Sequence, residues 1–186
     1  MGSTSATGRD DAHALFRFRK ATEGDAPLLT ELEQSAGLAY RADHEIAWVA
    51  EGDNHSPERY SEIIGDGWSW VAEGELAELV AFIAVTVEGQ ELHIWEFGVR
   101  LDCQRRGIGR RLLQRLIAEA AAAGKSAVTL TTFRDVPWNG PFYQSMGFEP
   151  LAPEKLDARL AALLAAEVEK GLPAARRCAM RKALLS

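Results

Sequence analysis

The sequence predicts an α/β (mixed α+β) protein in which helices cover both faces of one central mixed β-sheet. Residues 68–99 contain three apolar, strand-like segments separated by short turns with glycine, a pattern typical of an antiparallel meander. A helical segment at residues 110–123 then stands between two strand segments, and such a crossover joins parallel strands. The chain has 186 residues, 47% hydrophobic and 26% charged, which suits an ordinary globular domain.

The first segments predict a leader, a strand and a helix. Residues 1–12 are small and polar, so we expect a disordered leader followed by a single domain over residues 13–186. Residues 15–19 alternate between apolar and polar side chains, as a strand does. The next helix is expected to start near Thr22, a good capping residue, and to end at Gly37.

The meander follows an irregular stretch. Residues 38–66 are polar and irregular, apart from a short helix expected at 57–64. Strands are expected at 68–73, 79–87 and 92–99. The middle strand is almost entirely apolar and rich in β-branched residues, so we expect it to be central in the sheet.

The second half of the chain continues the alternation of helix and strand. The helix at 110–123 carries leucines on one stripe and ends before Gly124. The later predicted elements are a strand at 127–133, a short helix at 140–146, a strand from Phe148 and a helix at 153–169. Residues 178–184 are a strand or a helix, because their Ala, Met, Arg and Lys residues do not decide between the two.

Composition excludes several classes of protein. Cys103 and Cys178 are the only cysteines, which excludes a disulfide framework and a CxxC metal site. Neither an apolar stretch long enough to span a membrane nor a signal peptide is recognisable, so we expect a cytoplasmic protein with no membrane partner.

Charge is distributed unevenly along the chain, although the formal net charge is −6. Residues 21–99 hold seventeen acidic residues against two basic ones, whereas residues 100–115 hold six arginines against one aspartate. A basic island in an acidic chain favours one anionic ligand bound locally and a cationic group bound elsewhere. Solvated faces of different elements are the alternative explanation.

The segment from Val99 to Arg111, VRLDCQRRGIGRR, carries the strongest functional signal. It joins a strand to a helix through two glycines, which allow close approach of the backbone and positive φ angles. The free N–H groups at a helix start bind anions, and arginines add charge-assisted hydrogen bonds. The pattern therefore predicts a pyrophosphate cradle, with a tight structural turn as the alternative. It matches neither a P-loop nor a dinucleotide-binding fingerprint.

At this point the sequence resembles the GNAT (GCN5-related) N-acetyltransferases. Gln104–Gly109 matches the Q/R-x-x-G-x-G/A signature of that family. The second match is Asn139-Gly140-Pro141-Phe142-Tyr143 followed by Gly147-Phe148, which resembles the family's "N…FY…GF" helix. The two motifs stand in the family's order, and the resemblance extends over residues 15–184. It implies a splayed, mostly antiparallel sheet that binds acetyl-CoA.

The resemblance also implies which residues contact the cofactor. The signature turn would hold the pyrophosphate, and the strand that ends at Val99 would pair with the pantetheine arm. Asn139 and Phe142 would flank the cofactor on the other side of the splay. The residues expected to bind acetyl-CoA are thus Phe97, Gly98, Val99, Gln104, Arg105, Arg106, Gly107, Ile108, Gly109, Arg110, Asn139 and Phe142.

Acetyl transfer to an amine needs a proton donor for the thiolate and an acceptor for the amine proton. The resemblance assigns the donor role to Tyr143, with core packing as the alternative. Glu96 and His93 are the candidate bases, and strict strand alternation would place them on opposite faces. Glu96 is a carboxylate in an apolar strand, a conflict typical of functional positions, unless it pairs with an arginine such as Arg134.

We therefore expect an N-acetyltransferase that moves the acetyl group of acetyl-CoA to a primary amine, small and cationic, by direct attack in a ternary complex. A non-catalytic acyl-CoA-binding sensor is the alternative. Nucleic-acid binding is not expected, because one compact arginine cluster in an acidic chain does not make a basic face. We expect no metal, and a homodimer would be usual for such an enzyme. The acceptor amine itself is left open.

Overall fold

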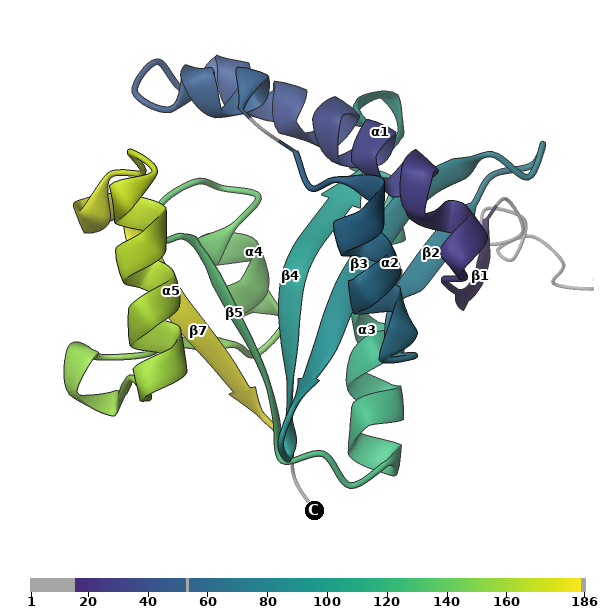
Figure 1. The fold of residues 1–186 in the computed structure, drawn as a ribbon. Helices are drawn as coiled ribbons and strands as arrows, with labels where there is room; N and C mark the ends of the chain where they lie inside the picture. The colour runs from purple at the N-terminus through teal and green to yellow at the C-terminus, as the bar shows by residue number, and fades with distance from the viewer. Residues whose placement is uncertain (1–15, 53, 185–186) are drawn as a thin grey trace, which may run out of the picture.

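All strands belong to one seven-stranded sheet, in the order β1-β2-β3-β4-β5-β7-β6 (Figure 1). The computed structural model describes residues 16–52 and 54–184, so the leader expected at residues 1–12 lies outside the described residues. Neighbouring strands are antiparallel except β4 and β5, which are parallel. The strands are β1 Arg17–Lys20, β2 Trp70–Glu73, β3 Leu79–Glu88, β4 Glu91–Val99, β5 Ala127–Phe133, β6 Glu149–Pro150 and β7 Arg177–Ala183.

Helices cover both faces of the sheet, as the sequence predicts (Figure 1). Two apolar cores lie on the two sides: one packs α1 and α2 against β3, and the other packs α3 and α4 against the opposite face. Helix α5 lies over β5 and β7, on the α1 side of the sheet. The helices are α1 Ala26–Gly37, α2 Pro57–Gly65, α3 Ile108–Ala122, α4 Gly140–Ser145 and α5 Ala158–Glu169.

The central position of β3 follows from its sequence. Phe82 and Ala84 belong to the core under α1 and α2, whereas Ile83 and Val85 belong to the core under α3. All four are fully buried, because a strand covered on both faces needs apolar side chains at every position.

A β-bulge in β4 changes which side chains share a face. Ala84 pairs with Glu96 and Val85 pairs with Ile94, so Trp95 is the extra residue of β4. The bulge reverses the alternation, and Glu96 comes to lie on the same α1 face as His93. The expectation that strict alternation separates His93 from Glu96 is therefore wrong.

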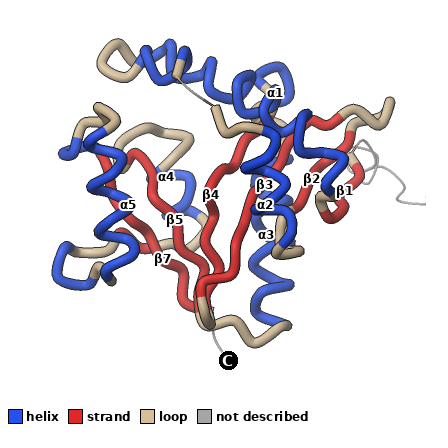
Figure 2. Tube along the Cα trace, viewed as in Figure 1, coloured by secondary structure: helices blue, strands red, loops and turns tan. Residues whose placement is uncertain are grey.

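The parallel pair β4–β5 is joined only along its first half. Register pairs run from Glu91–Ala127 to Ile94–Leu130, and no pair follows in the described chain. Beyond this point the backbones of the two strands diverge in the shape of a V (Figure 2), and we refer to this divergence as the V. The splayed sheet implied by the resemblance is confirmed.

In the second half of the chain, one segment differs from the prediction, and a segment whose structure the sequence left undecided proves to be a strand. The helix expected at 153–169 is interrupted: a 3₁₀ turn at Pro153–Lys155 precedes α5, and the Asp157 carboxylate caps α5 by accepting from Leu160 N–H at 2.7 Å. The undecided segment at 178–184 forms β7, paired with β5. No helix among the residues that the structure describes is long and apolar enough to cross a membrane.

Candidate active site

The signature turn forms a concave row of backbone N–H groups at the start of α3. The N–H groups from Arg105 to Arg110 have no hydrogen-bond acceptor within the described residues. Gly107 adopts φ 76°, and Arg105 also has a positive φ of 61°. A Cβ on Gly109 would come within 3.2 Å of Phe97 Cζ, so any larger residue would have to displace side chains of β4 for the helix start to lie this close. The turn therefore has the backbone geometry that an anion cradle requires.

The six arginines of the basic island do not act together. Arg105 and Arg106 are exposed on the turn itself. Arg110 instead reaches α4, where it donates to Ser145 Oγ at 2.9 Å and contacts Met146 Sδ at 3.0 Å. Arg111 and Arg115 lie over the ring of Phe18 on β1. Only part of the island can contact an anion at the cradle.

The far side of the V is formed by α4 and the residue before it. Asn139 Nδ2 donates to Thr132 Oγ1 at 3.0 Å and to the Tyr40 hydroxyl at 2.9 Å, which fixes its position beside β5. Phe142 lies 6.0 Å from Phe97 between ring centroids, so α4 and β4 approach each other across the V. Residues predicted to flank the cofactor thus come from both sides of the splay.

On the β4 side, the strand end leads directly into the cradle. Gln104 Nε2 donates to the Val99 carbonyl at 3.1 Å and ties the turn to the strand. Gly98 is buried on the α1 face, and Ile108 is buried in the α3 core. The strand segment Phe97–Val99 therefore borders the V directly beside the predicted pyrophosphate site.

Tyr143 is a buried residue of α4 that belongs to the main core. Its ring packs between Phe142 and Phe148, with centroid distances of 5.3 Å and 5.6 Å. Burial and the negative charge of Glu96 raise the pKa of its hydroxyl well above the ordinary value. The structure records no hydrogen-bond partner for this hydroxyl among the described residues, so the group is neutral and free to donate.

Glu96 lies immediately after the bulge, half-buried, where β4 leaves β5. Its only hydrogen bond within the described chain is from its own neighbour, Phe97 N–H, at 3.4 Å. Burial and the charge of Glu33 raise the pKa of its carboxyl to about 7, against the opposing effect of His55. Arg134 is not its partner, because that guanidinium donates to the Arg177 carbonyl.

His93 is enclosed in the sheet and does not have the properties of a general base. It is 1% exposed, and its Nδ1 lies 3.0 Å from Thr129 Oγ1. Burial and the nearby Arg159 guanidinium lower the pKa of its imidazole to about 3. A ring with that pKa binds a proton too weakly at neutral pH, so the structure disfavours His93 and leaves Glu96 as the candidate base.

Glu96 has neighbours that sequence reasoning missed. Glu33 on α1, His55 before α2 and Glu96 have carboxylate and imidazole atoms within 4.8 Å of one another. Tyr60 on α2 donates its hydroxyl to Glu33 Oε2 at 2.7 Å. Glu33 stands four residues after the buried Leu29, on the apolar stripe of α1. A charged residue at an apolar position was the one sequence feature that could have identified it as a site residue.

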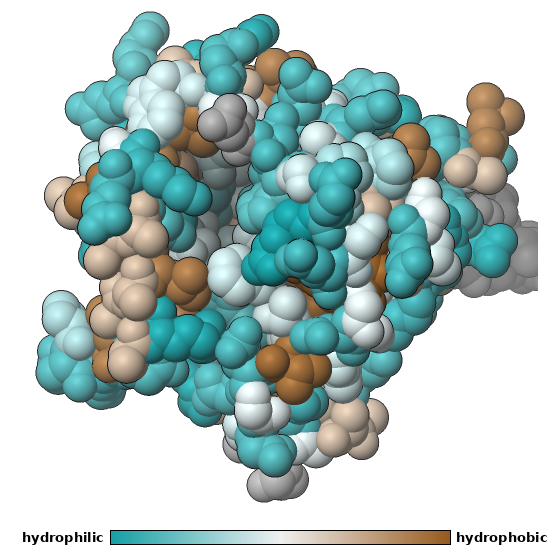
Figure 3. Space-filling model, viewed as in Figure 1, coloured by the Kyte–Doolittle hydropathy of each residue, from teal (hydrophilic) through white to brown (hydrophobic). Residues whose placement is uncertain are grey.

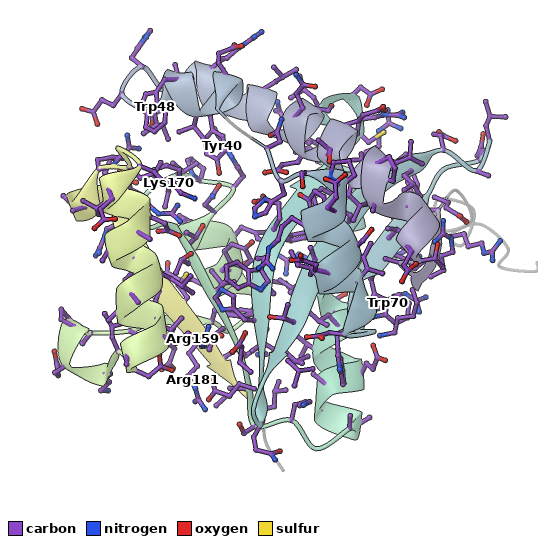
Figure 4. The ribbon with its side chains drawn as sticks, viewed as in Figure 1. Tyr40, Trp48, Trp70, Arg159, Lys170 and Arg181 are labelled. Carbon is purple, nitrogen blue, oxygen red and sulfur yellow. The ribbon has the colours of Figure 1, made fainter. Side chains whose placement is uncertain are left out.

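The segment between α1 and α2, residues 38–51, crosses toward the opposite wall of the V, and we name it the strap. Figure 4 shows Tyr40 and Trp48 on the strap, close to Lys170 at the end of α5. Arg176 binds the strap through Asp43 at 2.6 Å and Glu45 at 3.1 Å. The space-filling surface is hollowed between α5 and α2, below the strap (Figure 3).

The fold, the cradle and the V define the class of protein. The family model described as "Acetyltransferase (GNAT) domain" matches residues 43–150, and the chain belongs to that family. It is therefore an acyltransferase that depends on acetyl-CoA. The predicted family and fold class are confirmed.

Among solved structures, the chain is similar to several N-acetyltransferases. The ribosomal-protein-S18-alanine N-acetyltransferase of Escherichia coli aligns with a TM-score of 0.67 and 19% identity, over 92% of this chain and 96% of that one. PaiA N-acetyltransferase of Thermoplasma acidophilum, in complex with coenzyme A, aligns with a TM-score of 0.66 and 17% identity, over 90% of this chain and 98% of that one. N-acetylglutamate synthase of Neisseria gonorrhoeae aligns with a TM-score of 0.66 and 20% identity, over 94% of this chain and 36% of that one.

Proposed function

We propose that this protein transfers the acetyl group of acetyl-CoA to a small, cationic primary amine by direct attack in a ternary complex. The amine nitrogen bonds to the thioester carbonyl carbon, the C–S bond breaks, and the thiolate takes a proton. The acceptor must first lose a proton, because an alkylammonium with a pKa of about 10.4 has no lone pair to attack with. The chain must therefore supply a base on the acceptor side and a donor on the thiolate side.

One observation carries the proposal: Glu96 is a half-buried carboxylate at the bulge that forms no ion pair among the described residues, and its pKa is raised to about 7. A base with a pKa near the working pH is suited to proton transfer. An unpaired buried carboxylate is otherwise costly, so an ammonium group is the counter-charge that this position favours.

Tyr143 supports the second half of the chemistry. It stands on the α4 side of the V, and burial together with the charge of Glu96 raises the pKa of its hydroxyl, which keeps the group neutral. A neutral phenol is a suitable donor to a departing thiolate, whose thiol has a pKa of roughly 8.5. We assign Tyr143 as the general acid and Glu96 as the general base.

The cofactor-binding roles follow from the two borders of the V. The N–H row from Arg105 to Arg110 suits the pyrophosphate of acetyl-CoA, and the unpaired part of β4 up to Val99 offers backbone groups to the pantetheine arm. Asn139 and Phe142 would contact the cofactor from the α4 side. When bound, acetyl-CoA supplies the thioester that is attacked.

Charge and enclosure both favour a small, cationic acceptor. Glu33 and Glu96 place two carboxylates at the acceptor side, which favours a cation. The strap joins the two walls of the V through Arg176 and through the bond between Asn139 and Tyr40, which limits the space for a large acceptor. Both features favour a small amine over a protein chain.

The test is acetyl transfer to a panel of small primary amines that differ in charge, followed by mass detection of the acetylated product. Acetylated product from cationic amines, and little from neutral aromatic amines, is the expected result. Glu96→Gln should lose most of this activity near pH 7 while acetyl-CoA still binds. Tight binding of acetyl-CoA without product from any amine would instead favour the non-catalytic sensor.

A further inference from the structure

Glu33 is held in one position by donors from two other segments. Its Oε2 accepts from the His55 backbone N–H at 2.9 Å and from the Tyr60 hydroxyl at 2.7 Å. Its Oε1 lies 3.2 Å from His55 Nδ1. Because three donors fix Glu33, its carboxylate also fixes the imidazole of His55 on the side of Glu96.

Exposure to solvent increases from Glu33 to His55. The side chain of Glu33 is 13% exposed and that of His55 is 30% exposed. His55 is thus more open to water than the carboxylate that holds it. Its pKa is raised, chiefly by the hydrogen bond with Glu33, which favours the protonated form of the imidazole.

We propose that His55, positioned by Glu33, relays to solvent the proton that Glu96 takes from the acceptor amine. This inference rests on the proposed function of Glu96. The geometry that supports it is the close group of Glu33, His55 and Glu96, whose carboxylate and imidazole atoms lie within 4.8 Å of one another. One small side-chain rotation, or one bridging water, connects Glu96 to the imidazole across that distance.

The proton balance of one cycle is as follows. The ammonium form of the acceptor gives one proton to the Glu96 carboxylate, and the neutral amine attacks. Glu96 passes that proton to neutral His55, and the imidazolium is stabilised by the Glu33 carboxylate. The ring nitrogen that does not face Glu33 then releases a proton to water, which leaves His55 neutral again and Glu96 ionised for the next cycle. Tyr143 separately protonates the thiolate.

Charged groups from several elements act on Glu96. Glu33 on α1 raises its pKa, whereas His55 and Arg177 on β7 lower it. Tyr60 on α2, Tyr40 on the strap and Tyr143 on α4 stay neutral, with their pKa values raised by burial and by the charge of Glu96. Arg59 on α2 lowers the pKa of His55 in turn.

The experiment compares the pH profiles of kcat/KM for Glu33→Gln and His55→Gln, with saturating acetyl-CoA and a small cationic amine. Loss of the Glu33 charge should move the acid limb to lower pH, because a neighbouring negative charge is gone. Loss of His55 should move it to higher pH, because the protonated form of His55 lowers the pKa of Glu96. Opposite shifts are not expected from a merely structural defect. Glu31→Gln is the matched control, since it removes an exposed carboxylate of α1 that forms no ion pair among the described residues, and its acid limb should not move.

Chemical rescue provides the direct readout of the relay. His55→Gln should lower kcat by roughly 10-fold or more at pH 7, and added imidazole should restore part of it. Shifts in the same direction, or no rescue by imidazole, would overturn the relay, whereas acetyl transfer by the wild type would still support the proposed function. Activity should persist in EDTA. Its loss would also overturn the proposal, because the three side chains would then hold a metal ion.

Discussion

Glu96 is a carboxylate at a position of β4 where ionisation is unfavourable. The carboxylate is half-buried between Trp95 and Phe97, near the second negative charge of Glu33, and its pKa is raised to about 7. A carboxyl group that resists ionisation in the native state makes folding less favourable once the pH exceeds its ordinary pKa. The same property makes it a base matched to neutral pH, so we infer that stability is sacrificed here for chemistry.

The first prediction concerns the stability of Glu96→Gln. Between the ordinary pKa of about 4.3 and the native value of about 7, the native state holds more protons than the unfolded state, so unfolding free energy falls as pH rises. Above pH 7 the wild type has lost roughly 3 kcal/mol at this site, a loss that the neutral amide avoids. Urea denaturation should find the variant more stable at pH 8 and no more stable at pH 4. An equal difference at both values would contradict the burial effect.

The second prediction concerns Tyr143→Phe. The ring contacts with Phe142 and Phe148 are retained, and only the hydroxyl is lost. We expect kcat to fall by roughly 100-fold while the Kd for acetyl-CoA stays near the wild-type value, because only the proton donor is missing. Steady-state kinetics and calorimetric titration measure the two quantities. If kcat is unchanged, Tyr143 is a packing residue.

At the scale of residues, the sequence could identify only those candidates that conflict with their immediate neighbours in the chain. Glu96 could be selected because a carboxylate conflicts with its apolar neighbours. His93 was an attractive candidate only until burial and the Thr129 contact were known. Glu33 and His55 could not be placed beside Glu96, because contacts between residues so far apart in the chain depend on how α1 and α2 pack on the sheet.

At the scale of elements, the start of α3 is the part that we propose binds the diphosphate of acetyl-CoA. Its row of N–H groups exists because Gly107 bends the chain at φ 76° before the helix begins. The space around a Cβ at this position is open, so the backbone angle and the ligand, rather than packing, determine which residues are accepted.

The third prediction compares two substitutions of Gly107. Asparagine tolerates a positive φ and adds no charge, so Gly107→Asn should bind CoA nearly as well as the wild type. Gly107→Glu adds a carboxylate where the diphosphate is expected and should weaken binding by roughly 100-fold. Calorimetric titration with CoA measures both. Equal affinity of the glutamate variant would mean that the turn is only structural.

The sequence predicted the elements themselves well, except where tertiary pairing decides. The bounds of β5 match the predicted strand at 127–133. The bulge at Trp95 was missed, because alternation of apolar and polar residues assumes a regular strand. The segment of β7 was ambiguous by composition, and its pairing with β5 makes it a strand.

At the scale of the whole molecule, the strap connects the two halves that the splay separates. Arg176 contacts Asp43 and Glu45 on the strap and also Asp135, which follows β5. Ile46 packs with Phe133 and Val136 in a small separate core. The strap therefore joins the α1 side of the sheet to the β7 side over the acceptor space.

The fourth prediction tests this connection. Arg176→Ala removes the ion pairs to the strap, so amide hydrogen exchange across residues 38–51 should become several-fold faster, while β3 stays protected. The KM for the amine should rise more than kcat falls. Arg41→Ala, which breaks a pair with Glu51 inside the strap, is the control and should not change exchange at the β7 side. Unchanged exchange in Arg176→Ala would show that packing alone holds the strap.

The overall architecture was the most predictable level, because the order of strands and helices is visible in the apolar pattern. The splay was expected only from the resemblance, because the composition of β5 does not distinguish a strand paired along half its length from a fully paired one. The strap was predicted only as a polar, irregular stretch, because its role depends on contacts with the segment between α5 and β7. A homodimer and a cytoplasmic location stay predictions.

The most direct test of acetyl transfer is a single-turnover experiment with the protein in excess over acetyl-CoA. Free thiol and acetylated amine are measured in parallel after mixing, with and without a small cationic amine. Direct attack by the amine predicts that thiol appears only when the amine is present, in equal amount to the acetylated product, with no acetyl group left on the protein. Bound acetyl-CoA that stays intact with every amine would contradict transfer and indicate a sensor.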